Sequence, residues 1–288
     1  LSVWFSLFAP TILVAQTAAA YGWCTPEGVE QAACVMRLTP GYLTAVATFY
    51  DMLETKPVGR KTVYVCTNIS CSLCGADELL AAGVDAITLG NHSYHHREVY
   101  PYLDREPRIV RPANYLASQP GHGTCVVERD GIRLGVLNLS GNVFLRAARP
   151  AFQEADAAVE ALTRDGCDHI LVDMHAEATS EKVGLGWHLD GRVTAVVGTH
   201  THVPTADGRV LPGGTAYISD VGMTGARGGV IGVKKEQAIE SLITQMRVRF
   251  DTADDDPWLM GVVIRCSSPL RADAIEQVLV PAPPAPPA

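Results

Sequence analysis

The sequence predicts an α/β fold, in which a largely parallel or mixed sheet is covered by helices on both faces. Four β-rich apolar runs, helical patterns between them and one hairpin pattern predict this class. The hairpin pattern turns at Asp130-Gly131, a pair typical of tight β-turns. The apolar runs cover residues 84–90, 169–177, 193–202 and 215–222, the helical patterns residues 152–166 and 236–246, and the hairpin residues 123–141.

The N-terminal part of the chain is predicted to be mainly helical. Residues 1–20 carry no charge and lack a basic start, which favours a buried first helix over the alternative, an export signal. Thr25-Pro26 and Thr39-Pro40 are typical of helix starts, so two short amphipathic helices should follow. A strand over residues 62–68 and a helix over residues 75–83 complete this part.

The C-terminal part is predicted to contain two more strands, residues 246–253 and 259–266. The last residues, PAPPAPPA from 281 to 288, cannot pack a core and should form an extended tail. We therefore expect an N-terminal segment over residues 1–75, a main domain over 76–268 and a proline-rich tail over 269–288.

Composition limits the classes of function. The 288 residues carry a formal net charge of -8 and no basic block, which argues against binding to a nucleic-acid duplex. The eight cysteines lie mostly far apart, which favours reduced thiols in the cytoplasm. Beyond residues 1–20, no segment is long and apolar enough to span a membrane, and homo-oligomers remain open.

Potential metal ligands follow three of the apolar strands. They are Asn91 with His92, then His175, then His200 with His202. Because the carboxyl ends of parallel strands share one edge of a sheet, these side chains should lie close together. In an extended strand, His200 and His202 would also project to the same side. Each histidine alone is explained by hydrogen bonding at a strand end, but their clustering favours a divalent metal site.

The sequence resembles a known family over about residues 76–265. The runs GVDAITLGNH, EPRIVRPANY and VDMHAEATSEK through SDVGMTG are similar to YmdB-type metallophosphoesterases, calcineurin-like enzymes that hydrolyse 2',3'-cyclic nucleotides. The resemblance implies a calcineurin-like sandwich, a small phosphodiester substrate and one or two Mn or Fe ions. It also implies metal ligands at Asn91, His175, His200 and His202, and a catalytic imidazole at His92.

Carboxylates near this set differ from those of the family. The family's first-strand metal aspartate and its bridging glutamate have no counterpart here, so the sandwich should lack its first strands and activity should be reduced or lost. Asp173 and Glu177 flank His175 and are candidates for orienting ligand imidazoles, with solvated acids as the alternative.

Residues 18–80 resemble a different family, the thioredoxin-like [2Fe-2S] ferredoxin subunit of respiratory NADH:quinone oxidoreductase. Cys66 and Cys71 match its first cysteine pair, and the second pair is absent. Because a [2Fe-2S] cluster takes four protein ligands, we do not expect one here, and the two cysteines are interpreted as vestigial.

The leading hypothesis is therefore a metal-dependent phosphodiesterase. One alternative is an iron-sulfur electron-transfer protein, which would have the other subunits of a respiratory complex as its partners. Another is an inactive chimeric product, because both resemblances are incomplete and meet near the helix over residues 75–83 without a linker.

Overall fold

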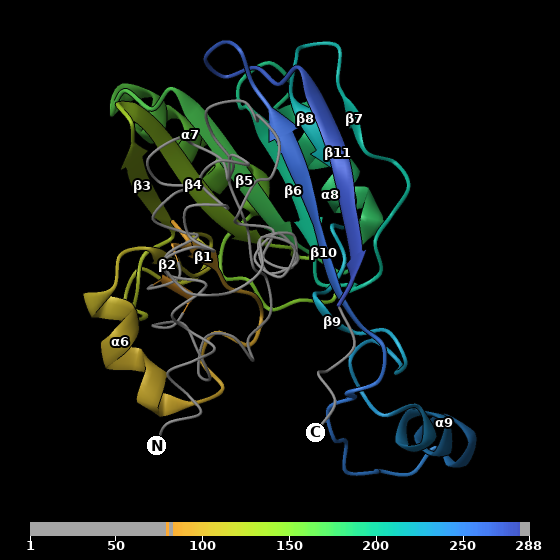
Figure 1. Cartoon of the computed structure of the whole chain (residues 1–288). Helices are drawn as coiled ribbons and strands as arrows, with labels where there is room; N and C mark the ends of the chain where they lie inside the picture. Colours follow the sequence, from red (N-terminus) through yellow and green to blue (C-terminus); the bar gives the residue numbers. More distant parts are fainter. Residues whose placement is uncertain (1–78, 81–82, 283–288) are drawn as a thin grey trace, which may run out of the picture. The chain divides into compact units, whose positions relative to one another are not determined.

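A computed structural model of the chain describes residues 79–80 and 83–282 (Figure 1). All of these except Ala282 belong to one compact unit, Val63–Pro281. The predicted N-terminal helices, the strand over residues 62–68, the cysteines at 66 and 71 and the last six residues of the proline-rich tail lie outside the described residues. Within the described ranges, no helix is long and apolar enough to cross a membrane.

The centre of the fold is a six-stranded mixed sheet with the strand order β3-β4-β5-β6-β8-β7. Neighbouring strands from β4 to β8 are parallel, and the edge strands β3 and β7 are antiparallel to their neighbours. This sheet confirms the predicted fold class. Its strands are β3 (Thr124–Arg129), β4 (Ile132–Ser140), β5 (His169–His175), β6 (Ala195–Thr199), β7 (Arg209–Val210) and β8 (Ala216–Ile218).

Continuous apolar runs form the central strands because both faces of the sheet are covered. Every residue of β6, and every residue of β5 after His169, is buried. The hairpin between β3 and β4 turns as predicted, with φ values of 51° at Asp130 and 73° at Gly131. Positive φ at both central residues is typical of the type I′ turn, whose twist matches the strands.

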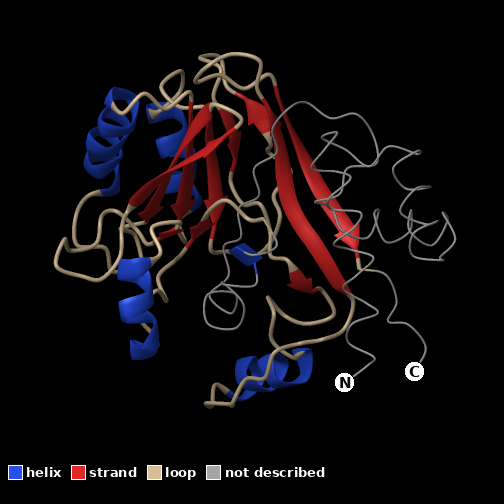
Figure 2. Cartoon of the chain, turned by 60° about the vertical axis from the view of Figure 1, so that its left-hand side comes forward, coloured by secondary structure: helices blue, strands red, loops and turns tan. Residues whose placement is uncertain are grey.

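Two helices cover one face of this sheet, α7 (Ala151–Arg164) and α8 (Thr179–His188) (Figure 2). On α7 the buried residues are Ala151, Ala155, Val159 and Leu162, a spacing that makes one apolar stripe. This stripe and Leu185 of α8 share a hydrophobic core with residues of β4 and β5.

A three-stranded antiparallel sheet lies against the other face, with the strand order β11-β10-β9. Apolar side chains of β10 and β11, among them Val262 and Ile275, pack against a core that includes Val136 and Leu171. The two sheets form the predicted sandwich. The strands are β9 (Gly225–Ala226), β10 (Pro257–Arg265) and β11 (Ala274–Pro281).

A third, two-stranded parallel sheet joins β1 (Ile87–Thr88) to β2 (Ile109–Val110). Between them lie a 3-10 turn, η1 (Arg97–Val99), and α6 (Tyr100–Arg105). The buried Asn138 of β4 ties this small sheet to the large one, because its Nδ2 donates to the carbonyl oxygens of Leu89 and Val110.

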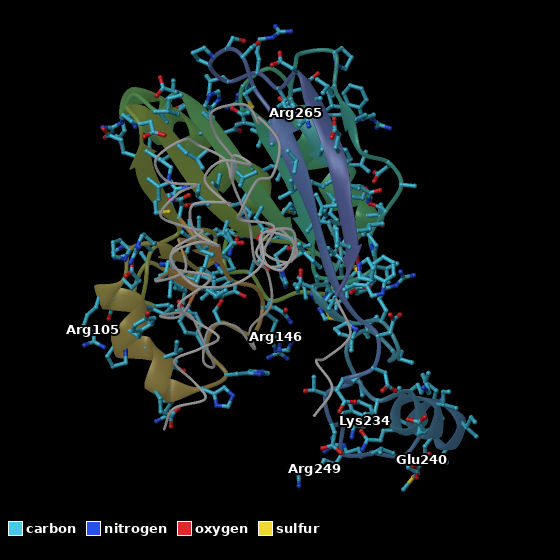
Figure 3. All side chains as sticks on the ribbon, viewed as in Figure 1. Arg105, Arg146, Lys234, Glu240, Arg249 and Arg265 are labelled. Atoms are coloured by element: carbon cyan, nitrogen blue, oxygen red, sulfur yellow. The ribbon has the colours of Figure 1, made fainter. Side chains whose placement is uncertain are left out.

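One helix projects from the sheets. This helix, α9 (Lys235–Thr244), buries only Ala238, and the residues in it and next to it in the sequence include several charged ones. Figure 3 shows Lys234, Glu240 and Arg249 gathered about it, while Arg265 lies at the far end of β10.

Three details of the predicted element order are corrected. Residues 246–253 form no strand. Most of them are exposed, and only Thr252 makes a bridge, to Val233. Residues 274–281, assigned to the tail, form β11, because their alternating pattern pairs along β10 from Arg265 to Trp258. The helix α8 was not predicted, because its two glycines weaken the helical pattern.

Candidate metal centre

Three of the predicted ligands lie together at the carboxyl ends of parallel strands, but not along one sheet as expected, because β1 belongs to the separate sheet that it forms with β2. β5 ends at His175, β6 ends one residue before His200, and Asn91 follows closely after β1. His175 Nε2 lies 2.9 Å from Asn91 Oδ1 and 3.1 Å from His200 Nδ1. Residues separated by 84 and 25 positions in the sequence thus converge on one imidazole nitrogen.

The other nitrogen of His175 is held by a buried relay. Thr199 donates its hydroxyl proton to Asp173 Oδ1 at 2.8 Å, so its oxygen is free to accept a proton from His175 Nδ1 at 3.0 Å. This relay places the ring proton on Nδ1 and leaves a lone pair on Nε2. Asp173 therefore orients His175 through Thr199.

Glu177 performs a similar task for His200. Its Oε2 lies 2.9 Å from His200 Nε2, which places a proton on that nitrogen and leaves a lone pair on Nδ1. Two acceptor atoms, Asn91 Oδ1 and His200 Nδ1, then face a third acceptor, His175 Nε2. Such atoms repel one another unless a cation lies among them. Two ligand atoms that are each about 2.1 Å from an ion, with a right angle between their bonds to it, are about 3 Å apart.

The backbone is shaped for this convergence. A Cβ atom on Gly90 would lie 2.3 to 2.8 Å from three atoms of the His175 ring, so no other residue fits there without a shift. His200 and His202 both adopt positive φ values, 94° and 66°. Such values are costly for residues other than glycine and are concentrated at functional sites.

Burial favours the neutral histidines that a metal requires. Burial is the largest cause lowering the pKa of His175 well below its usual value, with His200 and Lys182 adding to it. Burial also lowers the pKa of His200, against the opposing charge of Glu177. Burial raises the pKa of Asp173 to about 7.

The two remaining predicted residues lie beside this cluster. The pKa of His92 is lowered by burial and then by His95, whose Nε2 is 3.2 Å from His92 Nδ1. His202 Nδ1 lies 3.1 Å from the carbonyl oxygen of Ile231. The extended geometry expected for His200 and His202 is not formed, because β6 ends at Thr199 and the chain turns.

The described residues suit one ion better than two. Within residues 79–80 and 83–282, no three side chains of His, Cys, Asp or Glu are grouped to hold an ion, and the further oxygen beside His175 comes from the Asn91 amide. Glu177 and Asp173 act on the far nitrogens of the ligand rings. No carboxylate in this part of the chain takes the place of the family's bridging glutamate.

Lys182, Thr199, Thr201 and Asp220 were missed as site residues. Lys182 and Asp220 are each about 1% exposed and form an ion pair of 3.0 Å. This pair lies close to the turn over residues 200–202, here called the histidine turn. A charged residue directly after a buried strand, as in the run AYISD, was the signal available for Asp220. Threonines at strand ends carry no such signal.

Two family models match the chain. The model described as a YmdB-like protein matches residues 69–278, and the model of the thioredoxin-like [2Fe-2S] ferredoxin matches residues 8–98. The two matches overlap over residues 69–98.

Individual proteins show the same division. The chain is 47% identical to the 2',3'-cyclic-nucleotide 2'-phosphodiesterase of Bacillus subtilis over 70% of this chain and 76% of that protein. A crystal structure of a phosphatase from Mycoplasma pneumoniae is 31% identical, with a TM-score of 0.68 over 76% of this chain and 82% of the other. The NADH-quinone oxidoreductase subunit 2 of Thermus thermophilus is 40% identical over 20% of this chain and 32% of its own length.

Proposed function

Because the chain belongs to the YmdB-like family, we propose that it is a metal-dependent hydrolase of phosphodiesters with 2',3'-cyclic nucleotides as its substrate class. The Bacillus relative carries that activity in its name, and its similarity extends over the residues that form the candidate centre. The membership also implies use of a divalent metal.

The observation that carries this proposal is that an Asn91 oxygen and a His200 nitrogen both lie about 3 Å from His175 Nε2. Asn91 Oδ1, His175 Nε2 and His200 Nδ1 are the proposed ligands, and His202 is proposed as a further ligand beside them. When bound, a divalent ion supplies Lewis-acid polarisation of the phosphoryl group. Imidazole and amide oxygen donors suit Mn or Fe, which we propose as the metal.

His92 is the proposed catalytic imidazole. Its lowered pKa keeps the free ring neutral, and a bound phosphate anion would favour the protonated form again. A protonated ring can donate its proton to the leaving oxygen. The contact of 3.2 Å between His92 Nδ1 and His95 Nε2 fixes the ring's orientation.

We propose a reduced activity for this chain compared with two-ion relatives. Asn91, His175 and His200 are proposed donors for one ion. No carboxylate groups with two other His, Cys, Asp or Glu side chains in the described residues to hold a second ion. One ion can still polarise the phosphoryl group, but the clamp on both the attacking and the leaving oxygen is lost.

The electron-transfer alternative rests on the N-terminal match over residues 8–98. Among the described cysteines, Cys125 and Cys167 are buried in separate cores of the sandwich and cannot replace the missing second pair. The proposed boundary between residues 1–75 and the main domain and the proposed location in the cytoplasm rest on the sequence alone. The proposed boundary between 76–268 and 269–288 is moved toward the C-terminus by β11, which pairs along β10.

The proposal is tested by assaying the full chain for Mn²⁺-dependent hydrolysis of 2',3'-cyclic AMP. Losing a residue that hydrogen-bonds to a metal ligand typically costs roughly 10- to 100-fold. His175→Ala and His200→Ala each remove a proposed ligand itself, so each should lower the rate by more than that. His188→Ala is the matched control, because this histidine pairs with Asp156 on the helical face. Equal rates in His175→Ala and the parent chain would show that the ligand set is wrong.

A further inference from the structure

A buried ion pair lies directly behind the histidine turn. Lys182 comes from α8 and Asp220 follows β8, and their side chains meet at 3.0 Å with about 1% of each residue exposed. Burying two charges in this way is costly, so the pair needs further hydrogen bonds to be tolerated.

Those hydrogen bonds lead to the turn that carries the proposed ligands. Asp220 Oδ2 accepts from the Thr201 amide at 3.0 Å and from the Thr201 hydroxyl at 2.6 Å. Lys182 Nζ also donates to Thr201 Oγ1 at 3.1 Å. The second oxygen of Asp220 accepts from the amide of Gly222 at 2.8 Å.

Thr201 is the central residue of this turn. It stands between His200 and His202, whose φ values of 94° and 66° are both unfavourable for residues with a side chain. A strained conformation persists only where its surroundings over-determine it. Both the backbone and the side chain of Thr201 are held by the same carboxylate, which supplies that constraint.

The neighbouring backbone leaves room for the pair. A Cβ atom on Gly198 would lie 1.8 Å from the carbonyl oxygen of Ser219 and 2.9 Å from Lys182 Cδ. Glycine at this position therefore lets β6 and the segment after β8 approach closely while the lysine stem passes between them.

We propose that Lys182, Asp220 and Thr201 are positioning residues, which hold the turn over residues 200–202 so that His200 Nδ1 faces His175 Nε2. This inference rests on the proposed ligand set. It assigns a role in metal binding to a lysine and an aspartate that form hydrogen bonds to Thr201 and Gly222 rather than to the proposed ligand atoms.

The test compares three threonine variants by titrating the full chain with Mn²⁺ and measuring free Mn²⁺ by EPR. Thr201→Val removes the hydroxyl and keeps the shape, and we expect it to weaken Mn²⁺ binding about tenfold. Thr201→Ser keeps the hydroxyl and should restore binding. Thr215→Val is the matched control, because Thr215 loses a comparable buried bond, to the carbonyl oxygen of Val193, at the opposite edge of the sheet.

Asp220→Asn provides a second variant. The amide cannot accept at both positions, so one of the backbone amides of Thr201 and Gly222 would face an NH₂ group. We expect this variant to bind Mn²⁺ about tenfold more weakly when binding is measured well below its melting temperature.

A purely structural role would lower the melting temperatures of Thr201→Val, Thr215→Val and Asp220→Asn while leaving Mn²⁺ affinity unchanged, and that result would overturn the inference. His175→Ala separates the two proposals. If it abolishes Mn²⁺ binding while Thr201→Val and Asp220→Asn bind like the parent, only the positioning role fails. If His175→Ala binds like the parent, the ligand set fails and the positioning role fails with it.

Discussion

At the scale of single residues, His175 joins the candidate metal centre to the core. Its Nε2 faces Asn91 and His200, and its Nδ1 contacts Thr199, which in turn donates to Asp173. One buried relay thus sets the tautomer of the central ligand. The histidine was predicted from its place at the end of an apolar strand, whereas the threonine was not, because threonine is common in any strand.

Thr199→Val should weaken Mn²⁺ binding by about 10- to 100-fold, because the relay that fixes the His175 tautomer is lost. Isothermal titration calorimetry measures this change. Thr194→Val is a matched control, since Thr194 contacts His169 Nδ1 at 3.2 Å at the other end of the same two strands. Equal affinity in the Thr199 and Thr194 variants would contradict the proposed role of the relay.

His92→Gln should lower kcat by about 10²- to 10⁴-fold, the usual contribution of a general acid or base. Mn²⁺ affinity should stay close to that of the parent, because His92 lies beside the cluster and does not enter it. Steady-state kinetics at saturating Mn²⁺ separates these effects. A loss of rate that is fully recovered by adding more Mn²⁺ would show that His92 is a ligand instead.

At the scale of elements, the short sheet of β1 and β2 positions Asn91. The Asn138 side chain and backbone hydrogen bonds just after β2 connect this sheet to β4 and to the segment before β3. Those backbone bonds run from the amide of Arg111 to the carbonyl oxygen of His122 and from the amide of Ala113 to that of Asn138. Asn138 is fully buried, so its two side-chain bonds are made out of contact with water.

Asn138→Ala should lower the free energy of unfolding by about 1 to 3 kcal/mol, because the carbonyl oxygen of Leu89 would lose a buried donor and that of Val110 would keep only the amide of Leu89. Urea unfolding followed by circular dichroism measures it. A change below about 0.5 kcal/mol, the range of ordinary surface substitutions, would show that the connection is made elsewhere.

Strands with a strong local signal could be predicted, and those defined by distant partners could not. β5, β6 and β8 are apolar runs, and the β3–β4 hairpin carries Asp130-Gly131. The run over residues 246–253 alternates like a strand but has no partner strand to pair with. For the site, strand ends predicted Asn91, His175 and His200, while the turn that separates His202 from them depends on a buried pair contributed by α8 and the residue after β8.

At the scale of the whole molecule, two incomplete resemblances share one chain. The phosphoesterase match covers residues 69–278 and the ferredoxin match residues 8–98. The ferredoxin relatives are matched over a minor part of their length, 32% for the Thermus protein. The larger match coincides with a sandwich whose central strands end at the candidate centre.

The chain purified without oxygen should contain far less acid-labile sulfide than the two sulfides of a [2Fe-2S] cluster, because four protein ligands are not available to it. Colorimetric iron and sulfide determination checks this. Stoichiometric sulfide together with a visible charge-transfer band would favour the electron-transfer alternative.

Pulsed EPR of the Mn²⁺-loaded chain tests most directly the central claim that Asn91, His175 and His200 hold one ion. The account predicts couplings from imidazole nitrogens, one of which disappears in His175→Ala or His200→Ala and persists in His188→Ala. A spectrum without nitrogen couplings, or one that is identical in the parent and in His175→Ala, would contradict it.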